Sequence, residues 1–173
     1  MCLVYNKKDT EKFWKTKNRK GKDWCWAYKL YRISGGELFP PYGYASDDAL
    51  TYGEIVSDRR SKEAGKYNGD DCHLNVSDSV ITLDARYFLY INRGIHVITR
   101  SQNVAKCRKM INRDLSINDL IPLKLRLVRV KCYKEDFVAA DGDGNAVFMK
   151  IILPQEEFDR VIKKDEGAEY SHA

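Results

Sequence analysis

The sequence predicts an α+β fold, a single domain with a mostly antiparallel sheet of about five to seven strands and two or three short helices. Three observations predict it. Several short segments alternate apolar and polar residues, as strands buried on one face do. Two other segments place apolar residues at helical spacing. The chain has 173 residues, 43% of them hydrophobic, and is long enough to bury a core without disulfides.

The first half of the chain is predicted to contain two strands joined by irregular segments. Residues 26–33 are rich in aromatic side chains, which favour a strand. A glycine pair then turns the chain, and the two prolines in 38–44 fix a rigid loop. A short helical turn is expected at 46–49 and a strand at 52–56. Residues 58–78 are polar and contain glycines, so we expect a loop there.

The second half alternates strands with two helices. We predict strands at 80–83, 87–91, 94–99 and 123–132, and a hairpin of 137–139 and 146–153 around a turn at 141–145. One helix is predicted to have Ser101 as its N-cap, and Pro154 is predicted to open another. In the first of these helices Val104, Cys107, Met110 and Ile111 recur at helical spacing. As domains, we expect a basic aromatic arm at 1–24, one α+β domain at 25–166, and a frayed tail at 167–173.

The positive charge is concentrated near the N-terminus. Residues 1–32 hold ten Lys or Arg and three acids, whereas the rest of the chain holds 20 and 22. Aromatic residues are interleaved with these cations. Two interpretations are open: the arm binds a partner or nucleic acid, gripping phosphates and stacking bases, or it is a solvated arm whose rings dock on the core. The candidate binding residues are Trp14, Lys15, Lys17, Arg19 and Lys20.

The sequence favours neither a metal nor a cofactor. Its five cysteines are an odd number without a Cys-x-x-Cys pair, which argues against a disulfide framework and a structural zinc site. The segment 141–145 resembles the start of a calcium loop, but Ala146 and Ile152 stand where that loop needs Gly and Glu. No complete catalytic motif is present. The chain lacks a long apolar run and a signal-peptide pattern, so we expect a cytoplasmic protein.

His96 is the main candidate for a ligand contact. It alternates with apolar Ile95 and Val97 on a predicted strand and therefore points to the opposite side. A hydrogen-bonded structural histidine is one interpretation. The other is a shallow cleft for a phosphate or nucleotide, formed with nearby tyrosines and an arginine. The candidate ligand-binding residues are Tyr31, Arg32, Tyr42, Tyr44, His96 and Thr99.

The start of the chain and several short motifs, which together span roughly residues 26–153, resemble a set of uncharacterised small phage and prophage proteins. They are the Met-Cys-Leu start, Tyr-Lys-Leu-Tyr-Arg at 28–32, Leu-Phe-Pro-Pro-Tyr at 38–42, the Gly-Ile-His strand before a helix, Val-Arg-Val-Lys-Cys at 128–132, and Ala-Val-Phe-Met-Lys-Ile-Ile at 146–152. The family has no assigned activity. The resemblance implies an accessory protein that acts inside a bacterial cell, against a host or defence component.

A second resemblance is to ADP-ribosyltransferase-like domains. Gly94, Thr99, Ser101 and Ala105 are similar to the strand and helix that such domains share. The catalytic glutamate that these enzymes place before a late strand is absent, and Asp141 and Asp143 stand in that turn. This departure argues against transferase chemistry.

We therefore expect a binding protein rather than an enzyme. The expected partner is a host or defence protein in the bacterial cytoplasm, with weak, non-specific nucleic-acid binding as a further possibility and no membrane contact. The alternative is a nucleotide-binding enzyme, ADP-ribosyltransferase-like or a hydrolase, centred on His96.

Overall fold

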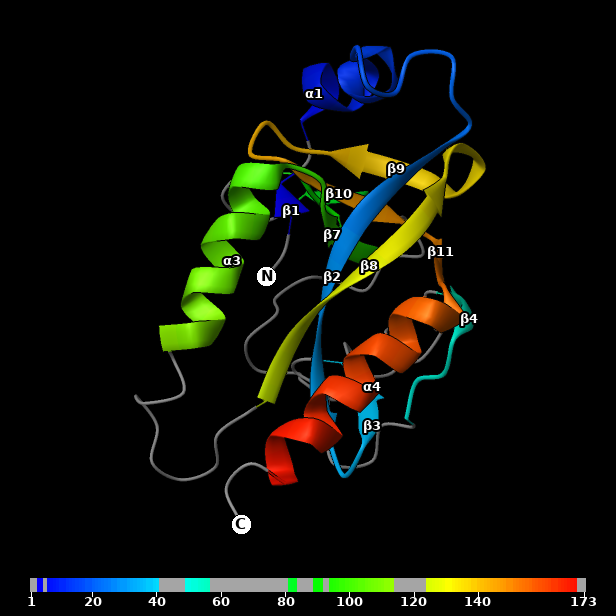
Figure 1. Ribbon diagram of the computed structural model, residues 1–173. Helices are drawn as coiled ribbons and strands as arrows, with labels where there is room; N and C mark the ends of the chain where they lie inside the picture. Colours follow the sequence, from blue (N-terminus) through cyan, green and yellow to red (C-terminus); the bar gives the residue numbers. More distant parts are fainter. Residues whose placement is uncertain are drawn as a thin grey trace. The chain divides into compact units, whose positions relative to one another are not determined.

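The computed structural model describes residues 3–4, 6–40, 49–56, 81–83, 89–91, 94–113 and 124–170 (Figure 1). The predicted α+β class is confirmed. The described residues form three α-helices: α1 (Lys7–Lys12), α3 (Ser101–Arg113) and α4 (Gln155–Tyr170). The 3-10 helix η1 (Phe13–Lys15) directly follows α1, and a second one, η3 (Lys134–Asp136), links two strands.

Most strands belong to one eight-stranded sheet. Its order is β4 (Gly53–Val56), β11 (Lys150–Leu153), β8 (Lys124–Tyr133), β2 (Trp24–Ser34), β7 (Ile95–Ile98), β10 (Asn145–Phe148) and β9 (Phe137–Ala140), with β3 (Glu37–Phe39) also paired to β2. The pairings of β2 with β3 and β7, of β8 with β11, and of β9 with β10 are antiparallel. A separate three-stranded sheet contains β1 (Leu3–Val4), β6 (Leu89–Ile91) and β5 (Ile81–Leu83).

The alternation of β2 explains why this segment is a strand. Cys25, Ala27, Tyr31 and Ile33 are buried on one face, whereas Trp26 on the other face remains exposed. Val128, Val130 and Cys132 of β8 alternate in the same way with exposed Arg129. Both strands therefore have a core face and a face that carries polar and aromatic side chains.

Gly94 is required where β7 begins. Its φ is +113°, a conformation that other residues rarely adopt. A Cβ built on it would collide with the side chain of Val147 and would lie 3.2 Å from the backbone oxygen of Phe148. The Gly-x-His motif thus has a packing reason at its first position, independent of any ligand.

The contacts divide the chain into two compact units. Unit 1 comprises Met1–Cys25, Val56–Val97 and Cys132–Ile151, and unit 2 comprises Trp26–Ile55, Ile98–Lys131 and Ile152–Ala173.

Three local expectations need correction. Residues 37–39 form β3 and pair with β2, so the first part of the expected rigid loop is a hairpin strand. The expected single strand after the turn at 141–145 is two strands, β10 and β11, separated at Met149, whose N–H donates to the Asp136 oxygen at 2.7 Å. Helix α4 continues to Tyr170, past the expected start of a frayed tail. The expected loop at 58–78 and most of the expected helical turn at 46–49 lie outside the described residues.

Candidate functional site

The basic N-terminal segment belongs to unit 1 and is packed on β9 and β10 through an aromatic cluster. Phe13 of η1 is only 5% exposed, and its ring stacks on that of Phe137 with centroids 4.7 Å apart. Trp14 packs edgewise against Phe13, Phe137 and Phe148. The rings of this segment therefore contribute to the core of unit 1, and the indole of Trp14 is already occupied by protein contacts.

Polar contacts hold the same segment in place. The Thr10 hydroxyl accepts from the Ala140 N–H at 3.1 Å and donates to the Ala140 oxygen at 3.2 Å, which fastens α1 to β9. Arg19 donates to the Phe13 oxygen at 3.1 Å, and its guanidinium carbon lies 3.9 Å from the centre of the Phe13 ring. Arg19 is thus a structural cation that closes the turn after η1.

The lysines of this segment all remain exposed, in contrast to its rings. We call residues 7–22 the lysine-rich segment; its exposed lysines are Lys7, Lys8, Lys12, Lys15, Lys17, Lys20 and Lys22. Among the described residues, only Lys7 of these seven forms an ion pair, with Glu11 at 3.9 Å. Of the predicted partner-binding residues, Lys15, Lys17 and Lys20 are therefore accessible to a partner, whereas Trp14 and Arg19 have structural contacts.

The predicted ligand-binding residues are distributed between the two units. His96 lies half-buried on β7 in unit 1, whereas Tyr31, Arg32 and Thr99 belong to unit 2. Tyr42 and Tyr44 lie outside the described residues. The cleft around His96 and the enzyme alternative built on it stay predictions.

Tyr31 and Arg32 cannot line one surface, because neighbouring residues on a strand point to opposite faces. Tyr31 is 2% exposed and lies on the core face of β2. Arg32 lies on the other face, with its guanidinium carbon 5.2 Å from the centre of the Phe39 ring. Of the two, only Arg32 is half-exposed and available to a ligand.

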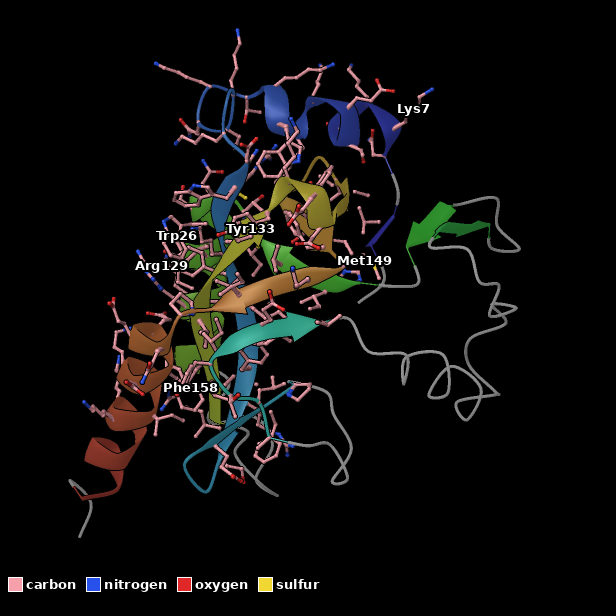
Figure 2. All side chains as sticks on the ribbon, turned by 90° about the vertical axis from the view of Figure 1, so that its right-hand side faces the viewer. Lys7, Trp26, Arg129, Tyr133, Met149 and Phe158 are labelled. Carbon is pink, nitrogen blue, oxygen red and sulfur yellow. The ribbon has the colours of Figure 1, made fainter. Side chains whose placement is uncertain are left out.

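A second cationic surface in unit 2 was not predicted from the sequence. We call it the arginine–aromatic face; it consists of Trp26, Tyr28, Arg108, Arg129 and Arg160. The guanidinium carbon of Arg129 lies 4.5 Å from the centre of the Trp26 ring, and that of Arg108 lies 5.9 Å from the Tyr28 ring. Figure 2 shows Trp26 and Arg129 side by side, above the N-terminal end of α4.

Glu157 of α4 fixes the position of two of these arginines. It is 9% exposed, and its carboxylate accepts the backbone N–H of Arg129 at 2.9 Å and two hydrogen bonds from Arg160, at 2.9 and 2.6 Å. Burial alone would raise the pKa of the Glu157 carboxyl, but the hydrogen bonds and charges of Arg160 and Arg129 bring it below its ordinary value. Glu157 is therefore ionised at neutral pH and ties α4 to β8.

The sequence contains part of the signal for this face. Trp26 and Tyr28 occupy alternate positions of β2, and Arg129 alternates with valines on β8. These patterns place each residue on the less buried side of its own strand. The rings and guanidinium groups come together only through the pairing of distant strands and helices, and the alternation patterns do not predict that pairing.

Two of the described cysteines are neighbours in the core of unit 1. Cys25 and Cys132 are 8% and 0% exposed, and both carry free thiols. Burial raises the pKa of both thiols, and the charge of Cys25 adds to the shift at Cys132. Cys107 of α3 is half-buried, and burial raises its thiol pKa as well.

These positions predict the order in which the thiols react. In a Cys2→Ser, Cys72→Ser chain at neutral pH, a disulfide reagent such as Ellman's is expected to modify Cys107 first, while Cys25 and Cys132 react only when the protein unfolds. A buried thiol with a raised pKa presents little thiolate to the reagent. The number of thiols that react, measured by absorbance with and without denaturant, checks this prediction. Rapid modification of all three thiols in the native protein would contradict the burial of Cys25 and Cys132.

Comparison of the chain with protein-family models, with curated proteins and with solved structures finds no match. In the part of the chain that the structure describes, no three His, Cys, Asp or Glu side chains are grouped so that they could hold a metal ion. No helix in the same residues is long and apolar enough to cross a membrane.

Proposed function

We propose that this chain is an accessory protein of phage or prophage type that acts by binding a host or defence component in the bacterial cytoplasm. The observation that carries the proposal is the lysine-rich segment. Its seven lysines are exposed on a backbone held by Phe13, Thr10 and Arg19. A fixed array of cations loses less conformational entropy on binding than a mobile arm does.

The charge of this segment defines the kind of partner that it suits. Residues 7–22 hold eight Lys or Arg and two acids. An array of this sign attracts acidic protein surfaces and phosphate backbones and accelerates their association. The proposed component therefore presents an acidic surface, in a host or defence protein or in nucleic acid.

Charge reversal tests this better than truncation does. Deleting residues 1–24 would also remove Phe13 from the aromatic cluster, so a loss of binding would be ambiguous. The variant Lys15→Glu, Lys17→Glu, Lys20→Glu changes three exposed side chains and leaves that cluster intact. Its matched control is Lys106→Glu, Lys163→Glu, Lys164→Glu, which changes the net charge equally on exposed positions of α3 and α4.

We expect the first variant to lose partners that the wild-type chain and the control capture from bacterial lysate at low salt. On duplex DNA, about five neutralised phosphates would give a log–log salt slope near −4, and reversing three lysines would make it shallower by roughly 3. Fluorescence anisotropy at several salt concentrations measures the slope. Equal capture and equal slopes for the two variants would remove the lysine-rich segment from the binding function.

A further inference from the structure

The arginine–aromatic face combines a partly exposed indole with several guanidinium groups. Trp26 is 40% exposed even though Arg129 stacks on its ring. The buried part of the indole stabilises the fold, and the exposed part leaves aromatic surface in contact with solvent. Trp26 thus keeps a large aromatic surface at the boundary with solvent.

The surroundings of the ring are positively charged. Arg108, Arg129 and Arg160 come from three different elements, α3, β8 and α4. Arg108 and Arg129 lie over the rings of Tyr28 and Trp26, and Arg160 is linked to Arg129 through Glu157. Among the described residues, Glu157 is the one carboxylate that pairs with these guanidinium groups, through Arg160. The face therefore carries a net positive charge beside an exposed aromatic surface.

The spacing of the two rings indicates the form of the ligand. Trp26 and Tyr28 are two residues apart on β2, which separates them by about 6.6 Å along the strand. Bases stacked in a duplex are only about 3.4 Å apart and offer no free face to a side chain. An extended single strand presents separate bases, each with phosphates nearby, and matches both the rings and the arginines.

We propose that the arginine–aromatic face binds single-stranded nucleic acid, with one base stacked on Trp26 and the adjoining phosphates at Arg108 and Arg129. The site is distinct in its residues from the lysine-rich segment and does not depend on the function proposed for that segment. Arginine contributes here in two ways, because its planar group stacks on rings and pairs with phosphate oxygens. Glu157 acts as a positioning residue, since it holds the backbone of Arg129 and the side chain of Arg160.

The test uses the full chain and a fluorescein-labelled oligo(dT) of about 12 nucleotides, a length within the usual site size for one domain. Trp26→Ala is expected to weaken binding about tenfold, the usual effect of losing one base–ring stack. Trp26→Phe should restore most of the affinity. Tyr52→Ala is the matched control, because Tyr52 is an aromatic residue of unit 2 that is 49% exposed and lies outside the face.

Tryptophan fluorescence provides a second measurement that a change in stability would not mimic. Bound oligo(dT) should quench the wild-type emission, and Trp26→Phe should lose most of this quenching while still binding the strand. Unlabelled duplex of the same length and thymidine monophosphate should compete much less well than the unlabelled strand.

The lysine variant separates this inference from the proposed function. Lys15→Glu, Lys17→Glu, Lys20→Glu should weaken all nucleic-acid binding, yet within that background Trp26→Ala should still cost about tenfold. Equal binding of oligo(dT) by wild type and Trp26→Ala would overturn the inference and leave the lysine-rich segment untouched. Equal competition by duplex or by the mononucleotide, or a Trp26-dependent protein partner without strand binding, would also overturn it.

Discussion

Replacing Phe13 by alanine is expected to destabilise the native protein by about 3 to 5 kcal/mol, the usual cost of emptying a buried aromatic site. Phe13 is 5% exposed and contacts Phe137, Phe148 and Trp14, and Arg19 stacks on its ring. Its removal therefore leaves a cavity and takes away the ring on which Arg19 rests. Denaturant unfolding followed by circular dichroism measures the loss.

The same substitution should also weaken binding through the lysine-rich segment, because Phe13 fixes its backbone. Phe13→Leu is the control, since it fills part of the site with an apolar side chain and should cost less than Phe13→Ala, although it too removes the ring beneath Arg19. If Phe13→Ala costs no more than an average surface change, below about 0.5 kcal/mol, then the N-terminal residues are not packed on β9 and β10. Binding should then also survive in that variant.

The sequence predicts an element well when the residues that determine it lie within that element and not in a distant partner. A strand was predicted at 26–33 from its aromatic side chains, and the structure has it as β2, Trp24–Ser34, with Ala27 and Ile33 buried. Strand β3 was missed because the two prolines that follow it dominate the local signal. Its pairing, Ile33 with Leu38, depends on the hairpin rather than on the pattern of residues 37–39. The break at Met149 likewise depends on a hydrogen bond to a distant residue, Asp136.

The two candidate binding surfaces also differ in how far the sequence predicts them. The lysine-rich segment could be found from composition alone, because solvated lysines remain exposed in nearly any fold. The sequence left open whether its aromatic rings bind a partner or dock on the core. The contacts of Phe13 and Trp14 are with the core of unit 1. The arginine–aromatic face could not be found in this way, because Trp26 meets Arg129 only when β2 and β8 lie in one sheet.

Lys29 provides a second large expected effect, this time on the pH dependence of stability. It lies on the same face of β2 as Ala27 and Tyr31, which are both buried. Burial lowers the pKa of its amine from 10.5 to about 8. Between these two values the unfolded chain binds more protons than the native protein, so native stability is expected to rise as the pH rises from about 8 to 10.5. Below pH 8 the native protein carries the cost of charging an amine that is only partly exposed.

Lys29→Met is therefore expected to stabilise the protein at pH 7 by up to about 3 kcal/mol, since methionine keeps the apolar stem and removes the charge. The rise in stability with pH that is due to Lys29 should disappear in this variant, and the gain over wild type should vanish above pH 10.5. Lys106→Met, which changes an exposed lysine of α3, is the control and should change stability little at any pH. Thermal unfolding at pH 7 and pH 10 measures both effects. A loss of stability in Lys29→Met at pH 7 would mean that the amine has an anionic partner in the native protein, and the sign of the pH dependence would then reverse because such a partner raises the pKa of a lysine.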